Sequence, residues 1–169
     1  MKKINKIILT AIIALSSLTY TFAQSKVAHI NTQELVASMP EMNTAKAELE
    51  KLAKTYETDI QTMAAELQSK VKQYDTEAPN QTDEENQKRL QEVQGMEQSI
   101  RQYQQQAQSD LQKKEFDLLK PISEKAQAAI IKVANAQGFD YVLDSTQGQG
   151  VILANGKDLM SDVKSELGF

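Results

Sequence analysis

The feature that most constrains this chain is a stretch of 38 residues, 41–78, that contains no glycine and no proline. The mean interval between its apolar residues is about 3.56, between the 3.5 of a heptad coiled coil and the 3.6 of a straight helix. The stripe is one residue wide, so the pattern predicts one long helix of a coiled coil. Its members are Met42, Ala45, Leu49, Leu52, Tyr56, Ile60, Met63, Leu67, Val71 and Tyr74.

A second long helix follows after a short break. Pro79 lies in the predicted loop 76–82, and Thr82 with Glu85 forms a capping box that restarts a helix. A similar apolar stripe then runs to residue 137, and Gly138 supplies a left-handed C-cap. The two stripes predict an antiparallel coiled-coil hairpin, an arm covering residues 41–120 with its tip near 76–82.

The returning helix is longer than the outgoing one, so its base is expected to run past the start of its partner and pack into the rest of the chain. Pro121 lies near that junction. Proline removes a backbone N–H and clashes with the preceding turn, so a kink or a restart of the helix is predicted there.

The two ends of the chain predict a small body made of residues 24–40 and 121–169. Residues 26–30 read as a strand, and a short helix is predicted over 32–39. Two further strands are predicted at 139–144 and 151–154, joined by a loop at 145–150 and followed by a terminal helix from 158 to 167. The fold class is therefore α+β and mostly helical.

Such a body holds too few apolar side chains to be stable alone. Three short strands bury far less apolar surface than a chain of 169 residues needs. Joining the bodies of several chains into one core would supply the missing burial. The residue pattern therefore predicts an obligate oligomer.

Composition excludes several classes of site. The chain has no cysteine and one histidine, which excludes disulfides, thiolate metal centres and cysteine nucleophiles. His29 lies in a predicted strand and is expected to be structural, and Asp140 and Asp144 are expected at a turn and a strand edge. Glu84 and Glu85 are adjacent on a helix and point in different directions, so they form no acid–base pair. We predict no enzyme, no cofactor, no metal site and no nucleic-acid partner.

Residues 1–23 have the order of a secretory signal peptide. Lys2, Lys3 and Lys6 precede an apolar run at 7–18, and small residues lead to a predicted cleavage after Ala23. Removing this segment leaves 16 basic and 23 acidic residues, a net charge of −7 rather than −4. A soluble periplasmic protein is expected.

The order of these segments resembles the Skp/OmpH family of periplasmic chaperones. The resemblance is specific in the strand Val27–Asn31, in Val133-Ala134-Asn135 and in Asp140-Tyr141-Val142-Leu143-Asp144. It is weaker around Glu66-Leu67-Gln68, where any coiled coil looks alike. It extends from Lys26 to Leu167.

The resemblance implies a homotrimer shaped like a jellyfish, with a small β-body and three helical-hairpin arms around a cavity. It also implies ATP-independent holding of unfolded outer-membrane β-barrel proteins, which prevents their aggregation. A rival interpretation is a coiled-coil spacer or adaptor of the envelope that docks one folded partner.

The tip departs from the basic character of the best-known members of that family. It carries five carboxylates, with no Lys or Arg between Lys72 and Lys88, and residues 41–137 carry 13 basic and 17 acidic residues. Anionic membrane surfaces repel such a tip, so strong binding to anionic lipid is not expected. The five carboxylates are Asp75, Glu77, Asp83, Glu84 and Glu85.

Candidate client-binding residues lie in the distal arm, where flexible apolar side chains suit weak and adaptable contacts. The alternative, favoured for each residue singly, is that they only hold the two helices together. The candidates are Met63, Leu67, Met96, Ile100 and Tyr103. A glutamine-rich stretch thins the apolar stripe over 102–111, and flexing of the arm is predicted there.

Overall fold

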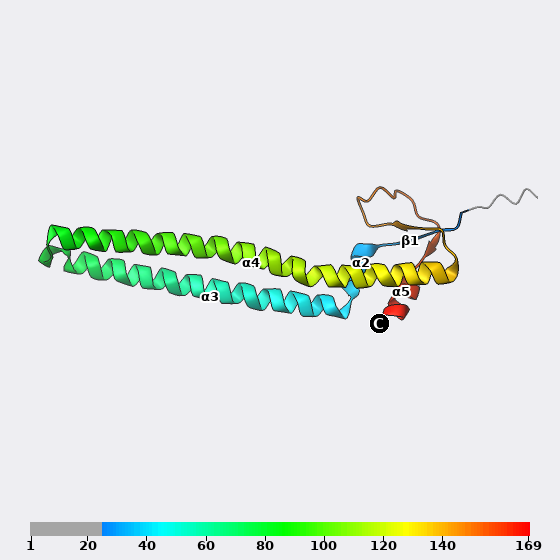
Figure 1. Ribbon diagram of the computed structural model, residues 1–169, viewed down its shortest axis with the longest axis horizontal. Coiled ribbons are helices and arrows are strands. Elements are labelled where there is room, and N and C mark those ends of the chain that lie inside the picture. The colour runs from blue at the N-terminus through cyan, green and yellow to red at the C-terminus, as the bar shows by residue number, and fades with distance from the viewer. Residues whose placement is uncertain (1–24) are drawn as a thin grey trace, which may run out of the picture.

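The computed structural model describes residues 25–169, so the predicted signal peptide lies outside the described residues. A long helical hairpin projects from a small body at one end (Figure 1). The body contains β1 (Val27–Ile30), α2 (Thr32–Ser38), β2 (Tyr141–Asp144), β3 (Lys157–Asp158) and α5 (Met160–Leu167). The hairpin contains α3 (Pro40–Glu77), the short 3₁₀ helix η2 (Ala78–Asn80) and α4 (Asp83–Gln137). The predicted α+β, mostly helical fold is confirmed.

The helix ends follow the local signals of the sequence. Asn31 caps α2 by accepting a hydrogen bond from the backbone N–H of Glu34, and Thr82 caps α4 by accepting one from Glu85. Gly138 ends α4 with φ 70°, and its N–H donates to carbonyls of the last turn. The turn at the tip is tighter than the predicted loop 76–82, because α3 continues to Glu77.

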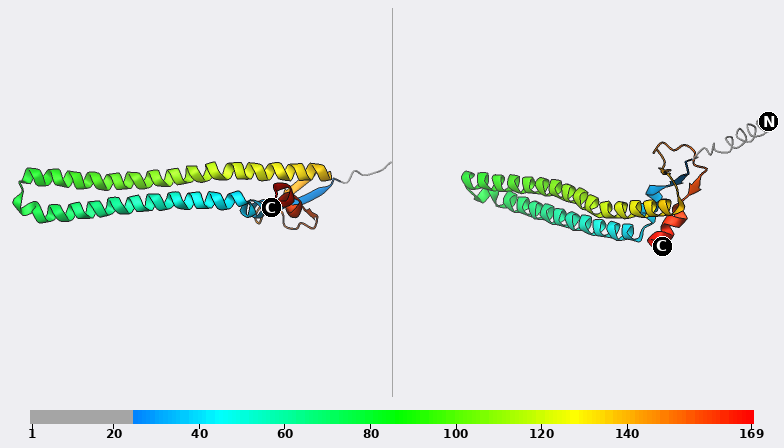
Figure 2. Two further views of the ribbon diagram at one scale, coloured as in Figure 1. Left: turned by 90° about the horizontal axis from the view of Figure 1, so that it is seen from below. Right: turned by 45° about the vertical axis from the view of Figure 1, so that its right-hand side comes forward.

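The two arm helices differ in length, as the stripes predict. α3 has 38 residues and is about 57 Å long, whereas α4 has 55 and is about 83 Å long. Pro121 does not restart α4, which stays one helix through it. The axis of α4 changes direction in its yellow-green part, before the yellow base (Figures 1 and 2). A bend N-terminal to proline is what the clash of its ring with the preceding turn produces.

Polar pairs along the arm show that its two helices keep one register from base to tip. In an antiparallel hairpin of constant register, the numbers of two facing residues have a constant sum. Here each cross-arm pair adds up to 162 or 166, and the difference of four residues is about one helical turn. No residue is therefore inserted or skipped along the hairpin. The pairs are Glu41–Lys125, Glu48–Lys114, Tyr56–Asp110, Asp59–Tyr103, Lys70–Glu92 and Glu77–Arg89.

The sheet of the body is entirely parallel, with strand order β2-β1-β3. The predicted strand at 151–154 is wrong, because the residues that pair with β1 are Lys157 and Asp158. Residues 151–154 belong to the connection that carries the chain from one edge of the sheet to the other, and Ile152 is fully exposed there. Their apolar pattern predicts a strand, but within residues 25–169 the connection has no neighbouring strand to pair with.

The core lies where the base of α4 meets the body, as the length of α4 predicts. Alanine and valine on α4 pack against β1, α2 and α5, and small side chains allow these elements to approach closely. The buried residues are Ala28, Ile30, Leu35, Met39, Ala45, Ile122, Ala126, Ala129, Val133, Ala134, Leu159 and Val163.

One carboxylate ties the two ends of the chain together. Oδ2 of Asp144 accepts a 2.6 Å hydrogen bond from the hydroxyl of Thr32, and Oδ1 accepts one of 2.6 Å from Thr146. The backbone N–H groups of both threonines also donate to Oδ1. Asp144 therefore fixes the end of β2 to the start of α2, which supports the structural role predicted for it.

Candidate binding surface along the arm

A hairpin of only two helices leaves its own apolar seam partly open to solvent. Within the arm, residues 41–120, only two side chains are buried: Ala45, near the base of α3, and Ala107 on α4. The other seam residues between them are half-buried or exposed, because no third helix covers the seam. One residue can therefore pack between the two helices and still be exposed to a ligand. The two roles considered for the distal-arm residues, holding the helices together and binding a client, do not exclude each other.

The five residues singled out in the sequence are all half-buried on this seam. The structure brings three of them together, since Met63, Met96 and Ile100 line one groove between α3 and α4. The groove has a volume of about 430 Å³ and is bordered by Glu66 and Glu92. Two flexible thioethers and a branched aliphatic chain form its apolar surface, which can adapt to side chains of different shapes.

Gly95 opens this groove and was not singled out in the sequence. It lies in the interior of α4, where glycine destabilises a helix by roughly 0.5–1 kcal/mol relative to alanine. A Cβ atom on Gly95 would meet no atom within 4 Å, and its φ is not positive. Packing and backbone geometry therefore do not require glycine here. Its missing side chain exposes the flanking apolar residues.

Leu67 and Tyr103 lie apart from that groove. Leu67 is half-buried nearer the tip. The hydroxyl of Tyr103 donates a 2.6 Å hydrogen bond across the arm to Asp59. This hydrogen bond is the main reason why the pKa of Tyr103 is raised to about 12. Tyr103 therefore holds the arm together, which is the alternative that the sequence left open for it.

A reciprocal pair of tyrosines and aspartates clasps the middle of the arm. Tyr56 on α3 donates to Asp110 on α4 over 2.9 Å, while Tyr103 on α4 donates to Asp59 on α3. The two rings meet edge to face with centroids 5.7 Å apart. We call these four residues the tyrosine clasp. Asp59 and Asp110 are not part of the apolar stripe. They meet their tyrosine partners only because the register of the hairpin places them opposite each other.

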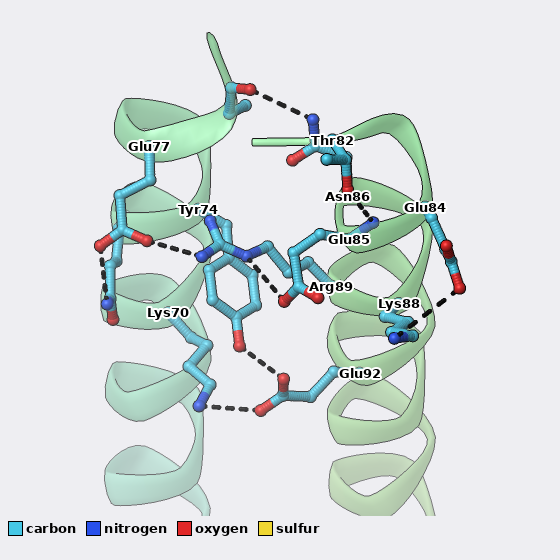
Figure 3. A network of polar contacts seen from close by, with 12 residues as sticks. Lys70, Tyr74, Glu77, Thr82, Glu84, Glu85, Asn86, Lys88, Arg89 and Glu92 are labelled. Atoms are coloured by element: carbon cyan, nitrogen blue, oxygen red, sulfur yellow. Dashed lines mark hydrogen bonds and ion pairs between the residues drawn. The ribbon is translucent and has the colours of Figure 1, made fainter. Parts of the chain in front are cut away.

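The tip is less acidic than its sequence indicates, because Arg89 folds back onto it (Figure 3). Its guanidinium lies 4.6 Å from the centre of the Tyr74 ring and pairs with Glu77 over 2.8 Å and with Glu85 over 3.6 Å. A hydrogen bond from Gln73, and then the one from Arg89, lowers the pKa of Glu77. Two of the five tip carboxylates are thus partly neutralised by an arginine just beyond the tip.

A second polar group closes the tip network one turn further down. Lys70 pairs with Glu92 over 2.8 Å, and the hydroxyl of Tyr74 donates to the same carboxylate (Figure 3). The hydrogen bond from Lys70 is the first cause that lowers the pKa of Glu92. These contacts join the ends of the two helices, and Glu92 also borders the groove lined by Met63, Met96 and Ile100.

The chain matches one protein family over nearly the whole described length. The family model described as outer membrane protein (OmpH-like) matches residues 26–167. The chain belongs to the OmpH-like family. The resemblance stated from the sequence is thereby confirmed, and the match includes both halves of the body as well as the arm.

A solved OmpH-like structure has the same fold. It is the crystal structure of an OmpH-like outer membrane chaperone from Caulobacter crescentus CB15, and it superposes with a TM-score of 0.76. The two chains share 19% sequence identity over 88% of this chain and 87% of that one. At this identity the similarity shows the fold alone. Among proteins of curated function, none matches this OmpH-like chain in sequence.

Within residues 25–169, no group of three or more His, Asp or Glu side chains is placed to hold a metal ion. No helix in the same range is both long and apolar enough to cross a membrane.

Proposed function

We propose that this protein is an ATP-independent holdase chaperone of the periplasm. It holds unfolded outer-membrane β-barrel proteins between its helical arms and prevents their aggregation, without catalysis and without a cofactor. In this proposal residues 1–23 are removed during export, with cleavage after Ala23. Membership of the OmpH-like family and the geometry of the arm support it.

The observation that carries the proposal is the open seam of the arm. A holdase needs many weak contacts that can rearrange, because its clients share apolar character and no single shape. The arm offers half-exposed apolar side chains along its length and a groove lined by Met63, Met96 and Ile100. These three residues are the proposed first contacts of a client. Leu67 extends the surface toward the tip, and Tyr103 contributes through its ring.

The proposal includes a trimer in which residues 24–40 and 121–169 form the body and residues 41–120 form each arm. A single two-helix arm offers a client a narrow strip. Three arms around a shared body would surround a client and multiply weak contacts through high effective concentration. The small core of one chain supports assembly through the body.

Light scattering tests the proposal. Several β-barrel proteins unfolded in urea are diluted into buffer with the mature protein, and with a control coiled coil of similar charge. A holdase suppresses aggregation of all of them near one trimer per client, without nucleotide. Protection of none, together with capture of one folded envelope protein, would instead support the spacer or adaptor.

A further inference from the structure

The negative charge of the arm is concentrated in its middle. The register of the hairpin brings residues 55–69 of α3 opposite residues 93–111 of α4. Together these two segments carry five acidic residues, which are Glu57, Asp59, Glu66, Glu97 and Asp110, and one basic residue, Arg101. The remainder of residues 41–137 carries twelve acidic and twelve basic residues. The whole net charge of −4 on residues 41–137 therefore arises in the middle of the arm.

The apolar groove between α3 and α4 lies at the tip side of this acidic part. No basic residue of the described chain lines the groove, and two carboxylates, Glu66 and Glu92, border it. Glu92 already has a cation, because Lys70 pairs with it over 2.8 Å (Figure 3). Within residues 25–169, no Lys or Arg forms an ion pair with Glu66, which is exposed to solvent. The groove thus has one compensated and one uncompensated carboxylate.

The basic residues nearest to Glu66 are engaged elsewhere. Lys70 follows Glu66 by one turn of α3, a spacing that suits an ion pair, but its Nζ turns to Glu92 and lies 5.5 Å from the centre of the Tyr74 ring. In the other direction the nearest base on α3 is Lys54, about 18 Å away along the helix. On α4, Arg101 pairs with Glu97 of its own helix over 3.8 Å.

An apolar floor beside an uncompensated carboxylate suits one kind of side chain. Lysine and arginine have an apolar stem and a charged head, and they bury the stem while keeping the head at the surface. The thioethers of Met63 and Met96 can pack against such a stem, with the head beside Glu66. An acidic side chain in the same place would be repelled by Glu66, so the groove discriminates by charge as well as by hydrophobicity.

We propose that this groove selects client segments in which lysine or arginine flanks an apolar stretch. The apolar stretch covers the open seam, and the flanking cation compensates Glu66. The inference rests on the proposed holdase function and names the class of segment that the arm holds. It concerns the groove of a single arm and does not depend on how many chains assemble.

Three labelled peptides test the selection. They share one apolar sequence and differ only in two flanking residues, which are lysine, glutamine or glutamate. Binding to the mature protein is measured by fluorescence anisotropy at low and at high salt. The lysine peptide should bind roughly three- to tenfold more tightly than the glutamate peptide at low salt, with the glutamine peptide between them. High salt should reduce the difference, because salt screens exposed charges.

Two variants of equal charge locate the effect. Glu66→Lys should remove or reverse the preference for the lysine peptide. Glu57→Lys, which changes an exposed carboxylate of α3 that does not border the groove, should keep most of the preference. Circular dichroism shows that both variants retain their helix content. An equal loss of preference in the two variants would overturn the role of the groove.

The remaining outcomes separate this inference from the proposed function. Equal affinity for the three peptides, or binding of none, would overturn the selection, and suppression of aggregation by the same protein would leave the holdase standing. A preference for the lysine peptide that depends on Glu66, without suppression of aggregation, would support the selection and refute the holdase.

Discussion

The hydroxyl of Tyr103 donates a 2.6 Å hydrogen bond to Asp59, a residue 44 positions earlier on the other helix of the arm. The reciprocal bond from Tyr56 to Asp110 lies one turn away, so that each helix gives one donor and one acceptor. The tyrosine clasp occupies the stretch where glutamines thin the apolar seam. Polar contacts there replace the apolar contacts that are missing.

Tyr103 should therefore resist ionisation. Its hydrogen bond to Asp59, together with burial, raises the pKa of the phenol from 10.0 to about 12. A raised pKa in the folded state means that this contribution to stability is complete below pH 10 and is lost between pH 10 and 12. Hydrogen bonds to Asp110 and Glu92 also raise the pKa of Tyr56 and of Tyr74, so tyrosinate absorbance should show several late titrations. Asp59→Asn should move the titration of Tyr103 toward 10. A Tyr103 that titrates near 10 in the parent protein would contradict the clasp.

The clasp also reverses one expectation from the sequence. Flexing was predicted over 102–111, but cross-helix bonds of the clasp now favour stiffness there. Hydrogen exchange should be slow across this stretch in the parent protein and severalfold faster in a Tyr56→Phe, Tyr103→Phe variant. Fast exchange in the parent protein would restore the original prediction of flexing.

Asp144 should make the body sensitive to acid. Burial raises the pKa of this carboxyl, but hydrogen bonds from Thr146 and Thr32 outweigh burial and hold it at about 2. A lowered pKa means that the stabilisation is present above about pH 4 and is lost as the pH falls toward 2. Because water screens part of the carboxylate, we expect Asp144 to contribute about 1 kcal/mol to the free energy of unfolding. Denaturant unfolding at a series of pH values measures this contribution.

Asp144→Asn should lower stability at pH 7 and flatten its dependence on pH between 4 and 2. Asp140→Asn is the matched control, since that exposed carboxylate accepts one backbone hydrogen bond from Lys26. Equal acid sensitivity in Asp144→Asn and the parent protein would show that another group causes it.

Substitutions at Gly95 should distinguish an effect on the stability of the arm from an effect on client binding. Gly95→Ala should stabilise α4 slightly and keep client affinity, because a Cβ meets nothing within 4 Å. Gly95→Gln should also favour the helix, but its side chain fills the groove, so client affinity should fall roughly three- to tenfold. Affinity is measured by fluorescence anisotropy of a labelled, unfolded β-barrel protein. Unchanged affinity in Gly95→Gln would remove the groove from the binding surface.

The acidic tip should keep the protein off anionic membranes. Arg89 neutralises part of Glu77 and Glu85, but Asp75 and Asp83 have no basic partner among the ion pairs of the described chain. Binding to anionic vesicles, measured by co-sedimentation, should not increase as salt is lowered. A variant with Asp75→Lys and Asp83→Lys should gain such binding. Vesicle binding by the parent protein that strengthens at low salt would contradict this prediction.

Local signals in the sequence predicted much of the fold. The caps at Asn31, Thr82 and Gly138 act within a few residues, and the apolar stripe specifies the long helices before any tertiary contact is known. The position of β3 was not predictable in this way. Lys157 and Asp158 have no strand pattern of their own and pair with β1 only because the chain returns there.

The candidate surface was predictable only in part. Met63, Met96 and Ile100 follow from the apolar stripe as candidates, and the structure shows that they line one groove. Gly95 is a single glycine in a helical pattern, and its role depends on which side chains stand beside it. The partners of Tyr56 and Tyr103 depend on the hairpin register, which the sequence fixes only once the position of the tip turn is known.

The methionines provide the most direct test of whether clients bind the distal arm. With methyl groups labelled by ¹³C, the mature protein should give separate NMR signals for Met39, Met42, Met63, Met96 and Met160. On addition of an unfolded β-barrel protein, we predict that the signals of Met63 and Met96 shift, while that of the buried Met39 does not. A client that is held in solution while Met63 and Met96 stay unchanged would contradict the proposed binding surface.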